Sequence, residues 1–344
     1  MKTKIIQEKK LPEFIKNLVD KGIKVIAPVK KENLVVFDQV QLFNEISLDQ
    51  VNTKKSIKEY FFAECETVCK YKIEKSDVQL KDVEKVAVPT VIFGSRPCDA
   101  ASLPILDEVF HWDYDDKFYF DRREATTIIS ISCLDCAEDC FCTAVEGDPG
   151  NTSGSDLLFT NIGDGKFLVE IITEKGQKLV DAMSEFFEEG SGDKDKALKS
   201  VREKLGKKFE LVEVKKWLDE NFDSPYWKNR FNICIGCGTC TFLCPTCHCF
   251  DIQDETTPTT GRRVKNWDAC QFKVFTLHAS GHNPRNYQYE RQRQRIMHKF
   301  RYYKDKFGKT LCVGCGRCVT YCPVDLSLLQ SLQIIDKESK VTVR

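Results

Sequence analysis

The sequence predicts an α/β amino-terminal domain over residues 1–225, followed by a mainly helical, cysteine-rich domain over residues 226–344. Three observations indicate this organisation. Short β-branched runs alternate with helical patterns through the first part of the chain. The composition changes after Pro225, and eleven of the 18 cysteines fall between residues 234 and 322. One cysteine motif also occurs twice in the second part, which indicates a single structural unit used twice.

The elements of the first part follow from apolar spacing and from turn residues. Helices are expected where apolar residues recur every three or four positions, and strands where β-branched residues cluster. The expected strands are 23–29, 33–40, 85–94, 126–133, 157–160 and 166–172, and the expected helices are 11–22, 95–110 and two or three over 174–222. The last two strands read as a hairpin, whose turn lies in NIGDGKF (161–167).

Two of these expected strands lead directly into cysteines, and loops at strand ends commonly carry functional groups. Cys98 lies in RPCD, and the segment CLDCAEDCFC follows the strand over 126–133. Four thiolates would complete a [4Fe–4S] cluster here. The alternatives are a zinc site, a [2Fe–2S] cluster or free core thiols. The preferred ligands are Cys98, Cys133, Cys140 and Cys142, with Cys136 in reserve.

The repeated motif is the strongest signal in the chain. CIGCGTCTFLCP (234–245) and CVGCGRCVTYCP (312–323) both read C-x2-C-x2-C-x3-C-P, the run that binds [4Fe–4S] clusters in two-cluster ferredoxins. A ferredoxin-like fold is expected, in which the fourth cysteine begins a helix and ligates the other cluster. Zinc is a weaker alternative. The predicted ligands are Cys234, Cys237, Cys240 and Cys322 for one cluster, and Cys312, Cys315, Cys318 and Cys244 for the second.

Several cysteines remain outside these sets. Cys247, Cys249 and Cys270 are interpreted as buried thiols, and the alternative is a further metal site completed by His248. Cys65 and Cys69 are four residues apart, a spacing that would let them share one helix face, and thiols without a role are favoured for them. His278 and His282 are expected to make structural hydrogen bonds rather than to bind metal.

The segment 285–309 contains nine Arg and Lys residues against Glu290 and Asp305. Two interpretations carry equal weight. The positive charge either raises the potentials of nearby clusters or docks an acidic partner. Alternatively, the segment is an ordinary solvated helix face.

Composition narrows the class of protein. Lys plus Arg equals Asp plus Glu at 52 each, which gives no general reason to expect nucleic acid or an anionic membrane as a partner. The charged start lacks the apolar core of a signal peptide, and no apolar run is long enough to span a membrane. A cytoplasmic location is expected, where dense cysteine favours metal over disulfides. NIGDGKF lacks the third glycine of a dinucleotide site.

The motifs SRPCD, CFC, CPTCHCFD, WDACQF, HASGHNPR, RQRQRIMHKF and CVGCGRC occur in an order that resembles one family. It is the β (iron–sulfur) subunit of cytoplasmic sulfhydrogenases, which is related to the corresponding iron–sulfur subunit of anaerobic sulfite reductase. The resemblance implies electron transfer that connects a flavin/NAD(P)-binding subunit with a catalytic redox subunit of hydrogenase, sulfite-reductase or heterodisulfide-reductase-like type. Members of this family typically have fewer cysteines around CFC, and Cys136 is the additional one in this chain.

The sequence therefore predicts a non-catalytic electron-transfer subunit of a soluble complex, with two [4Fe–4S] clusters and a third in the amino-terminal domain. The insert over 246–311 is expected to wrap around the dicluster core and to form a docking surface. Two alternatives remain. One is an enzyme subunit whose cluster has an open coordination site, and the other is a zinc-stabilised interaction module.

Overall fold

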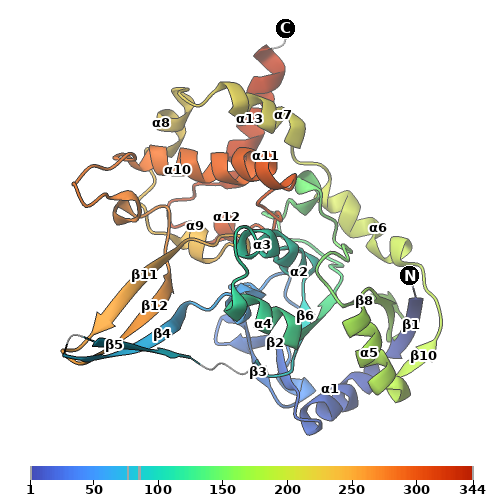
Figure 1. The fold of residues 1–344 in the computed structure, drawn as a ribbon. Helices are drawn as coiled ribbons and strands as arrows, with labels where there is room; N and C mark the ends of the chain where they lie inside the picture. The colour runs from blue at the N-terminus through green and yellow to red at the C-terminus, as the bar shows by residue number, and fades with distance from the viewer. Residues whose placement is uncertain (1, 76, 84–86, 343–344) are drawn as a thin grey trace.

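The structure, a computed structural model, describes residues 2–75, 77–83 and 87–342. It has three parts: a large sheet covered by helices, a projecting four-stranded arm, and a carboxy-terminal group of helices (Figure 1). The α/β class predicted for the amino-terminal part is confirmed. No helix among the described residues is long and apolar enough to cross a membrane.

The large sheet has eight strands in the order β10-β1-β9-β8-β7-β6-β2-β3. Its four central strands, β2, β6, β7 and β8, run parallel, and the outer strands pair antiparallel. The β8–β9 hairpin and its turn, where Asp164 has a positive φ, are as predicted. The bounds are β1 Lys2–Gln7, β2 Lys24–Lys31, β3 Leu34–Val40, β6 Thr90–Ser95, β7 Thr126–Ile131, β8 Leu157–Gly163, β9 Lys166–Ile171 and β10 Phe187–Glu189.

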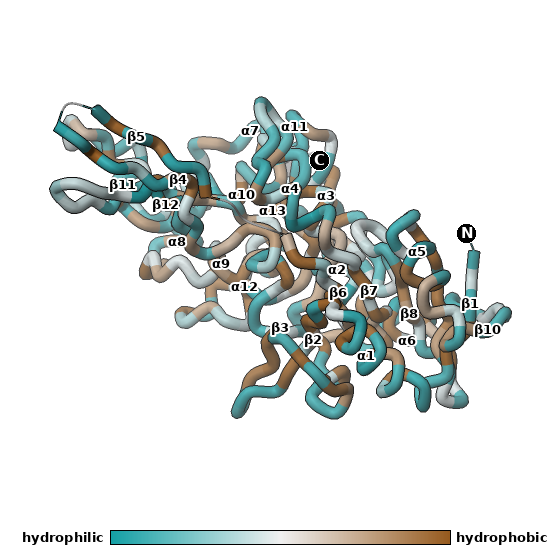
Figure 2. Tube along the Cα trace, turned by 60° about the horizontal axis from the view of Figure 1, so that its bottom comes forward, coloured by the Kyte–Doolittle hydropathy of each residue, from teal (hydrophilic) through white to brown (hydrophobic). Residues whose placement is uncertain are grey.

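Helices cover both faces of this sheet because its central strands carry apolar side chains on both sides. Ile129 of β7 faces the core that contains α1 and α5, while Ile128 faces the core that contains α3 and α4. Figure 2 shows hydrophobic stretches of the chain around these central strands. The helices of the amino-terminal part are α1 Leu11–Asp20, α2 Pro97–Ala101, α3 Leu103–Phe110, α4 Lys117–Ala125, α5 Glu174–Ala182, α6 Lys194–Leu205 and α7 Leu211–Glu220.

The arm is an antiparallel sheet in the order β11-β12-β4-β5, and it projects from the body in Figures 1 and 2. Its strands are β4 Cys65–Glu74, β5 Asp77–Asp82, β11 Phe250–Thr256 and β12 Thr260–Trp267. The helix considered for Cys65 and Cys69 is therefore wrong. In ETVCKYKIE, which follows Cys65, the alternation of β-branched and aromatic residues with charged ones suits a half-exposed strand and outweighs the four-residue cysteine spacing.

The carboxy-terminal part packs around a core that it shares with the amino-terminal part, which contributes Phe141, Val145 and the buried face of α7. Helix α10 continues through a π-helical turn into α11. The chain regions on the two sides of residue 225 share both the arm and this core. The domain boundary near residue 226 therefore stays a prediction. The helices are α8 Tyr226–Phe231, α9 Thr239–Phe242, α10 Gln288–Met297, the π turn His298–Tyr302, α11 Tyr303–Phe307, α12 Arg317–Thr320 and α13 Leu328–Thr342.

One detail of the repeated motif differs from expectation. The third cysteine of each copy lies within a short helix, Cys240 in α9 and Cys318 in α12. The fourth cysteine follows that helix instead of beginning one. Short 3-10 turns complete the described structure at Glu8–Lys10, Phe43–Glu45, Ile57–Tyr60, Cys142–Val145, Ser184–Phe186 and Lys273–Thr276.

Candidate metal centres

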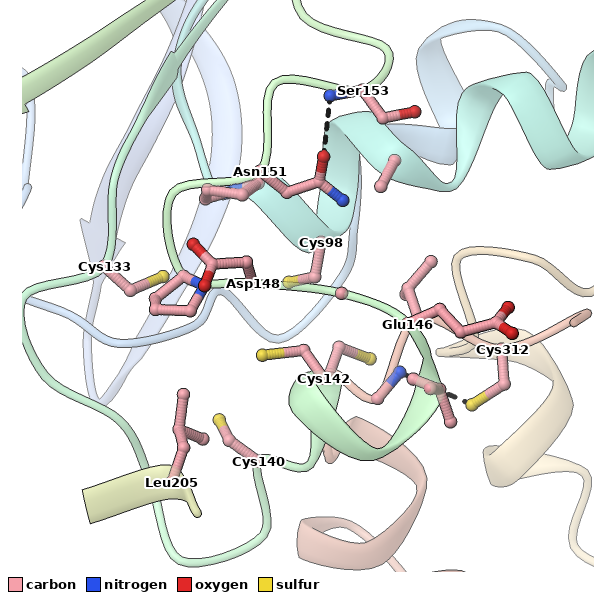
Figure 3. Close-up of a pocket in the computed structure, with 18 of the residues that line it drawn as sticks. Cys98, Cys133, Cys140, Cys142, Glu146, Asp148, Asn151, Ser153, Leu205 and Cys312 are labelled. Atoms are coloured by element: carbon pink, nitrogen blue, oxygen red, sulfur yellow. Dashed lines mark hydrogen bonds between the residues drawn. The ribbon is translucent and has the colours of Figure 1, made fainter. Parts of the chain in front are cut away.

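A cavity of about 400 Å³ lies at the carboxyl ends of β6 and β7. These strands are parallel neighbours, so the loops that follow them meet at one edge of the sheet. Figure 3 shows the sulfurs of the four preferred amino-terminal cysteines pointing into this common space. The reserve residue, Cys136, lines the same cavity and packs against helix α6. The five amino-terminal cysteines, Cys98, Cys133, Cys136, Cys140 and Cys142, are thus brought together.

Burial dominates the acid–base properties of these thiols. It raises the pKa of Cys133 and Cys140 to about 11 and that of Cys142 to about 12, and it raises the pKa of Cys98 well above its usual value. The thiolate charge is therefore poorly stabilised by the protein alone. Metal binding displaces the thiol proton and supplies the missing positive charge. Several buried thiols facing one cavity fit a metal cluster in this respect.

Asn52 connects this cavity to the second copy of the repeated motif. Its side-chain amide lies 3.8 Å from Cys140 Sγ and donates a hydrogen bond to the Cys315 carbonyl oxygen at 2.8 Å. Cys98 Sγ lies 3.9 Å from the side-chain oxygen Oδ1 of Asn52. Cys312 and Cys315 also line the amino-terminal cavity. The two groups of cysteines are therefore immediate neighbours.

The two motif copies surround two further, much smaller cavities. Cys234, Cys237, Cys240 and Cys322 line one of about 20 Å³, and Cys318 reaches it as well. Cys244, Cys312, Cys315 and Cys318 line the other, of about 10 Å³. In each cavity three cysteines of one copy thus meet the fourth cysteine of the other copy.

Glycines allow the motif loops to turn tightly at these cavities. Gly314 has a φ of +63°, and a Cβ built there would lie 2.5 Å from the backbone nitrogen of Cys142. Gly316 has a φ of +78°, and its Cβ would lie 2.7 Å from the carbonyl oxygen of Asp139. Both contacts are with backbone, which cannot move aside easily. The second motif loop thus packs directly on the CLDCAEDCFC segment, and only glycine fits there.

Several cations are buried around the cavities of the repeated motif without an ion pair to a carboxylate among the described residues; besides Arg291, which lies beside Cys234, three of them are close to the other motif cysteines. Lys299 Nζ lies 3.2 Å from Cys244 Sγ and donates to the carbonyl oxygen of Leu311 at 2.9 Å. Lys58 Nζ donates to the carbonyl oxygen of Cys247 at 3.0 Å. The third cation is Arg295, whose buried Nε has no hydrogen-bond partner.

Burying a cation is costly unless an opposite charge lies close by. For Lys299 burial opposes the charge, but the sulfurs of Cys244 and Cys247 outweigh it and raise its pKa. A hydrogen bond from Cys247, together with the Lys299 charge, lowers the pKa of Cys244 well below its usual value. Anionic clusters held by these cysteines would compensate the cations, so the residues present fit [4Fe–4S] clusters. For Lys299 and Arg295 the solvated-face interpretation of 285–309 is wrong.

The cysteines outside the predicted ligand sets also share a cavity. Cys247, Cys249 and Cys270 line it together with the rings of His248 and His298, which lie 5.5 Å apart in an edge-to-face arrangement. Burial lowers the pKa of the two histidines to about 4 and about 3. Within the described ranges no three Cys, His, Asp or Glu side chains converge closely enough to hold a single metal ion. A further metal at this place is therefore not proposed.

His278 and His282 belong to a tight turn, in which the His278 amide donates to the His282 carbonyl oxygen at 2.9 Å. Sequence reasoning missed Asn52 and Lys58, which lie in the amino-terminal part and reach the cavities only through the tertiary fold. Lys and Asn are common at protein surfaces, so the sequence alone does not indicate which of them are buried.

Comparison with known proteins agrees with this iron–sulfur site. Residues 233–326 match the family model of the 4Fe-4S dicluster domain, which spans both motif copies. The chain is an iron–sulfur protein with [4Fe–4S] clusters. It is 31% identical over 331 residues to the β subunit of sulfhydrogenase 2 of Pyrococcus furiosus, covering 95% of both chains, and it belongs to that family.

A second relative is the β subunit of an F420-dependent formate dehydrogenase of Methanocaldococcus jannaschii. It is 29% identical over 184 residues, which cover 51% of this chain and 40% of that protein. Both relatives are β subunits of oxidoreductases that contain several subunits. The resemblance stated from the sequence is thus confirmed, and the chain is an electron-transfer subunit of the iron–sulfur oxidoreductase class.

Proposed function

We propose that this chain relays single electrons through three [4Fe–4S] clusters and so connects a flavin/NAD(P)H-type subunit with a catalytic redox subunit. Each cluster supplies a one-electron couple whose potential depends on charge, hydrogen bonds and burial around it. The chain's own residues hold the clusters and exclude water. The proposed ligand sets are Cys234, Cys237, Cys240 and Cys322 for cluster 1, Cys312, Cys315, Cys318 and Cys244 for cluster 2, and Cys98, Cys133, Cys140 and Cys142 for cluster 3, with Cys136 as an alternative.

The observation that carries this proposal is the contiguity of the three cavities. Cys318 lines both cavities of the repeated motif. Cys312 and Cys315 line the cavity proposed for cluster 2 and also the amino-terminal cavity. Cluster 2 would thus lie between the other two, with Asn52 at its junction with cluster 3. This order supports a continuous path for electrons from one side of the molecule to the other.

The arrangement around cluster 2 also supports a ferredoxin-like pairing, in which each motif contributes its fourth cysteine to the other cluster. The partner classes rest on the relatives, which are β subunits of a sulfhydrogenase and of a formate dehydrogenase. An electron-transfer subunit in either setting has to pass electrons between a hydride-handling centre and a second redox centre. These two relatives differ in their catalytic reaction, so they do not specify the terminal catalytic subunit.

The number of clusters is tested by iron analysis of the chain purified without oxygen. Three clusters of four irons predict about twelve iron atoms per chain, and Cys98→Ser is expected to reduce this to about eight. Cys136→Ser is the matched control and should retain the full content. If the wild type holds only about eight irons and Cys98→Ser leaves its iron content and visible spectrum unchanged, cluster 3 is excluded. If the wild type holds about twelve irons and Cys136→Ser lowers that number instead of Cys98→Ser, Cys136 is the ligand in place of Cys98.

The exchange of fourth cysteines is tested separately. Cys322→Ser is expected to alter the electron paramagnetic resonance (EPR) signal of the cluster held by Cys234, Cys237 and Cys240. Cys244→Ser is expected to alter the signal of the other cluster of the repeated motif. An effect of Cys322→Ser confined to the cluster of its own motif copy contradicts the crossed assignment.

The size of the amino-terminal cavity favours one second candidate. At about 400 Å³ it falls within the range of small-molecule pockets, roughly 300–1,000 Å³, and polar side chains such as Asn151 and Ser153 line it. An enzyme subunit in which cluster 3 has an open iron site would use this space. Cyanide is the probe: a change in the EPR signal of cluster 3 on its addition supports the open site, and an unchanged signal supports the relay.

A further inference from the structure

The loop that holds the proposed cluster 1 reaches the surface. Of the eight cysteines in the two motif copies, Cys237 alone is exposed. Its neighbours Ile233 and Ile235 are exposed to 56% and 64%. Gly236 of the same loop lies close to Gln288, at the start of α10. The first motif loop thus exposes one of the proposed ligands of cluster 1 to solvent.

More exposed apolar side chains lie on the segment that packs beside this loop. Val274 is 70% exposed and Tyr287 is 63% exposed. Phe272, two residues before Val274, lies against Gly238 of the motif loop. Figure 1 shows this segment as the orange loop that leads into α10, at the edge of the carboxy-terminal part. We call the surface formed by Ile233, Ile235, Val274, Leu277 and Tyr287 the cluster-1 face.

The two segments that carry the cluster-1 face hold only positive charge, although the whole chain is balanced and Glu290, just after them, accepts a hydrogen bond from the Tyr287 amide at 2.8 Å. Residues 224–249 and 269–289 contain no Asp or Glu. Lys228, Lys273 and Arg285 lie in these segments, and none of them makes an ion pair with another described residue. Elsewhere many surface cations are paired, for example Arg262 with Glu255. Unpaired cations around exposed apolar side chains are typical of a surface that meets carboxylates on another protein.

We infer that the cluster-1 face is the docking site for a redox partner subunit whose contact surface is apolar at its centre and acidic at its rim. This inference rests on the proposed function. The apolar side chains would exclude water from the contact, and the three cations would pair with the partner's carboxylates. Docking would bring the partner's own redox centre close to cluster 1, and one electron would pass between them without proton transfer.

The test uses the full chain with its iron loaded, and an acidic ferredoxin as the probe. Val274→Asp places a carboxylate in the centre of the face. Val212→Asp is the matched control, because Val212 lies on α7, outside both segments, and is 74% exposed. The rate of electron exchange with the ferredoxin is followed by stopped-flow spectroscopy at low salt. Methyl viologen, a small carrier that needs no docking surface, reports on the clusters themselves.

We expect Val274→Asp to lower the second-order rate with ferredoxin at least tenfold, while Val212→Asp stays within twofold of the wild type. Both variants should exchange electrons with methyl viologen at the wild-type rate. A water-soluble carbodiimide should link Lys228 or Lys273 to ferredoxin carboxylates, and Lys273→Glu should weaken the exchange at low salt but not at high salt.

Equal ferredoxin rates for Val274→Asp and Val212→Asp overturn the inference, as does carbodiimide linkage only through other lysines. Self-association of the wild-type chain that Val274→Asp abolishes would also overturn it, because the face would then bind a second copy. Failure of the iron-loaded wild-type chain to exchange electrons even with methyl viologen is a separate result. It would instead refute the proposed relay function.

Discussion

Lys299 offers the sharpest test of how the protein controls its clusters. Its ammonium is buried, lies 3.2 Å from Cys244 Sγ, and is also bonded to Thr246 and to the carbonyl oxygen of Leu311. Reduction adds a negative charge to a cluster, so a cation nearby favours the reduced form. Replacing Lys299 by Met keeps the volume and removes the charge. The midpoint potential of cluster 2 should therefore fall.

The size of the effect follows from Coulomb's law. For about 6 Å between the ammonium and the centre of a cluster, and an effective dielectric constant of about 20, the interaction is about 2.8 kcal/mol. A tenfold change in a one-electron equilibrium is about 59 mV and about 1.4 kcal/mol, so the shift is about 120 mV as an upper value. Reorientation of nearby dipoles and water reduces it, and we expect a fall of about 50–120 mV.

The assay is a redox titration followed by EPR without oxygen, with iron analysis to show that the clusters are assembled. Arg301→Met is the control, because Arg301 lies two residues further along the same helix but is paired with Asp219 at 2.9 Å. In Arg301→Met the midpoint potential of cluster 2 should change by less than about 20 mV, because the Arg301 charge is already compensated by Asp219 and screened by solvent. A cluster 2 potential in Lys299→Met that is unchanged or raised, at full iron content, refutes the reasoning. If that variant loses iron, Lys58→Met should show a fall of the same sign.

Two further predictions concern stability. Burial lowers the pKa of His298 to about 3. Below about pH 6.5 the unfolded chain therefore binds a proton on this ring that the folded chain does not bind. The free energy of unfolding should fall by on the order of 2 kcal/mol between pH 7 and pH 5 because of this ring. In urea unfolding, His298→Gln should reduce this loss, whereas His111→Gln should not, because Asp115 raises the pKa of His111. Gly314→Ala should destabilise the chain by more than about 3 kcal/mol, since a clash at 2.5 Å with Cys142 adds to the left-handed backbone. Gly308→Ala, at a similar φ with open space around it, should cost only about 1–2 kcal/mol, and equal thermal shifts for the two variants would contradict this argument.

Much of the site could be predicted because its chemistry is local in the chain. The C-x2-C-x2-C-x3-C-P runs place three cysteines on one tight loop, and the family comparison confirms them as a dicluster domain. Predicting that Cys98 and Cys133 lie close together needed only one more inference. Both follow parallel strands, and the carboxyl ends of parallel neighbours meet at one edge of a sheet. The ligand sets themselves stay predictions until they are tested.

The parts that sequence reasoning missed depend on contacts between distant segments. The arm joins β4 to β12 across almost 200 residues, and no local pattern indicates that pairing. Lys58 and Asn52 come from the segment before β4. Lys58 reaches Cys247 of the insert, and Asn52 reaches Cys140 and Cys315, so both contacts depend on the tertiary fold. The charges of α10 left two interpretations with equal weight, a positive charge that acts on the clusters or on an acidic partner, and a solvated face, since a run of Arg and Gln normally lies in water. Arg295 is buried instead, beside the cysteines of cluster 1.

The burial of the α10 cations and the proposed relay have one physical cause. Three cavities lined by thiols lie in a row, and the protein surrounds two of them with cations that no carboxylate among the described residues neutralises. Without an anionic centre such an arrangement would lower the stability of the fold by leaving buried charge uncompensated. With clusters in place, the same cations would stabilise both the fold and the reduced clusters. The positive charge typical of a surface helix is then also what α10 would need if it lies between two anionic clusters. The stability of the carboxy-terminal part should therefore depend on the iron of these clusters.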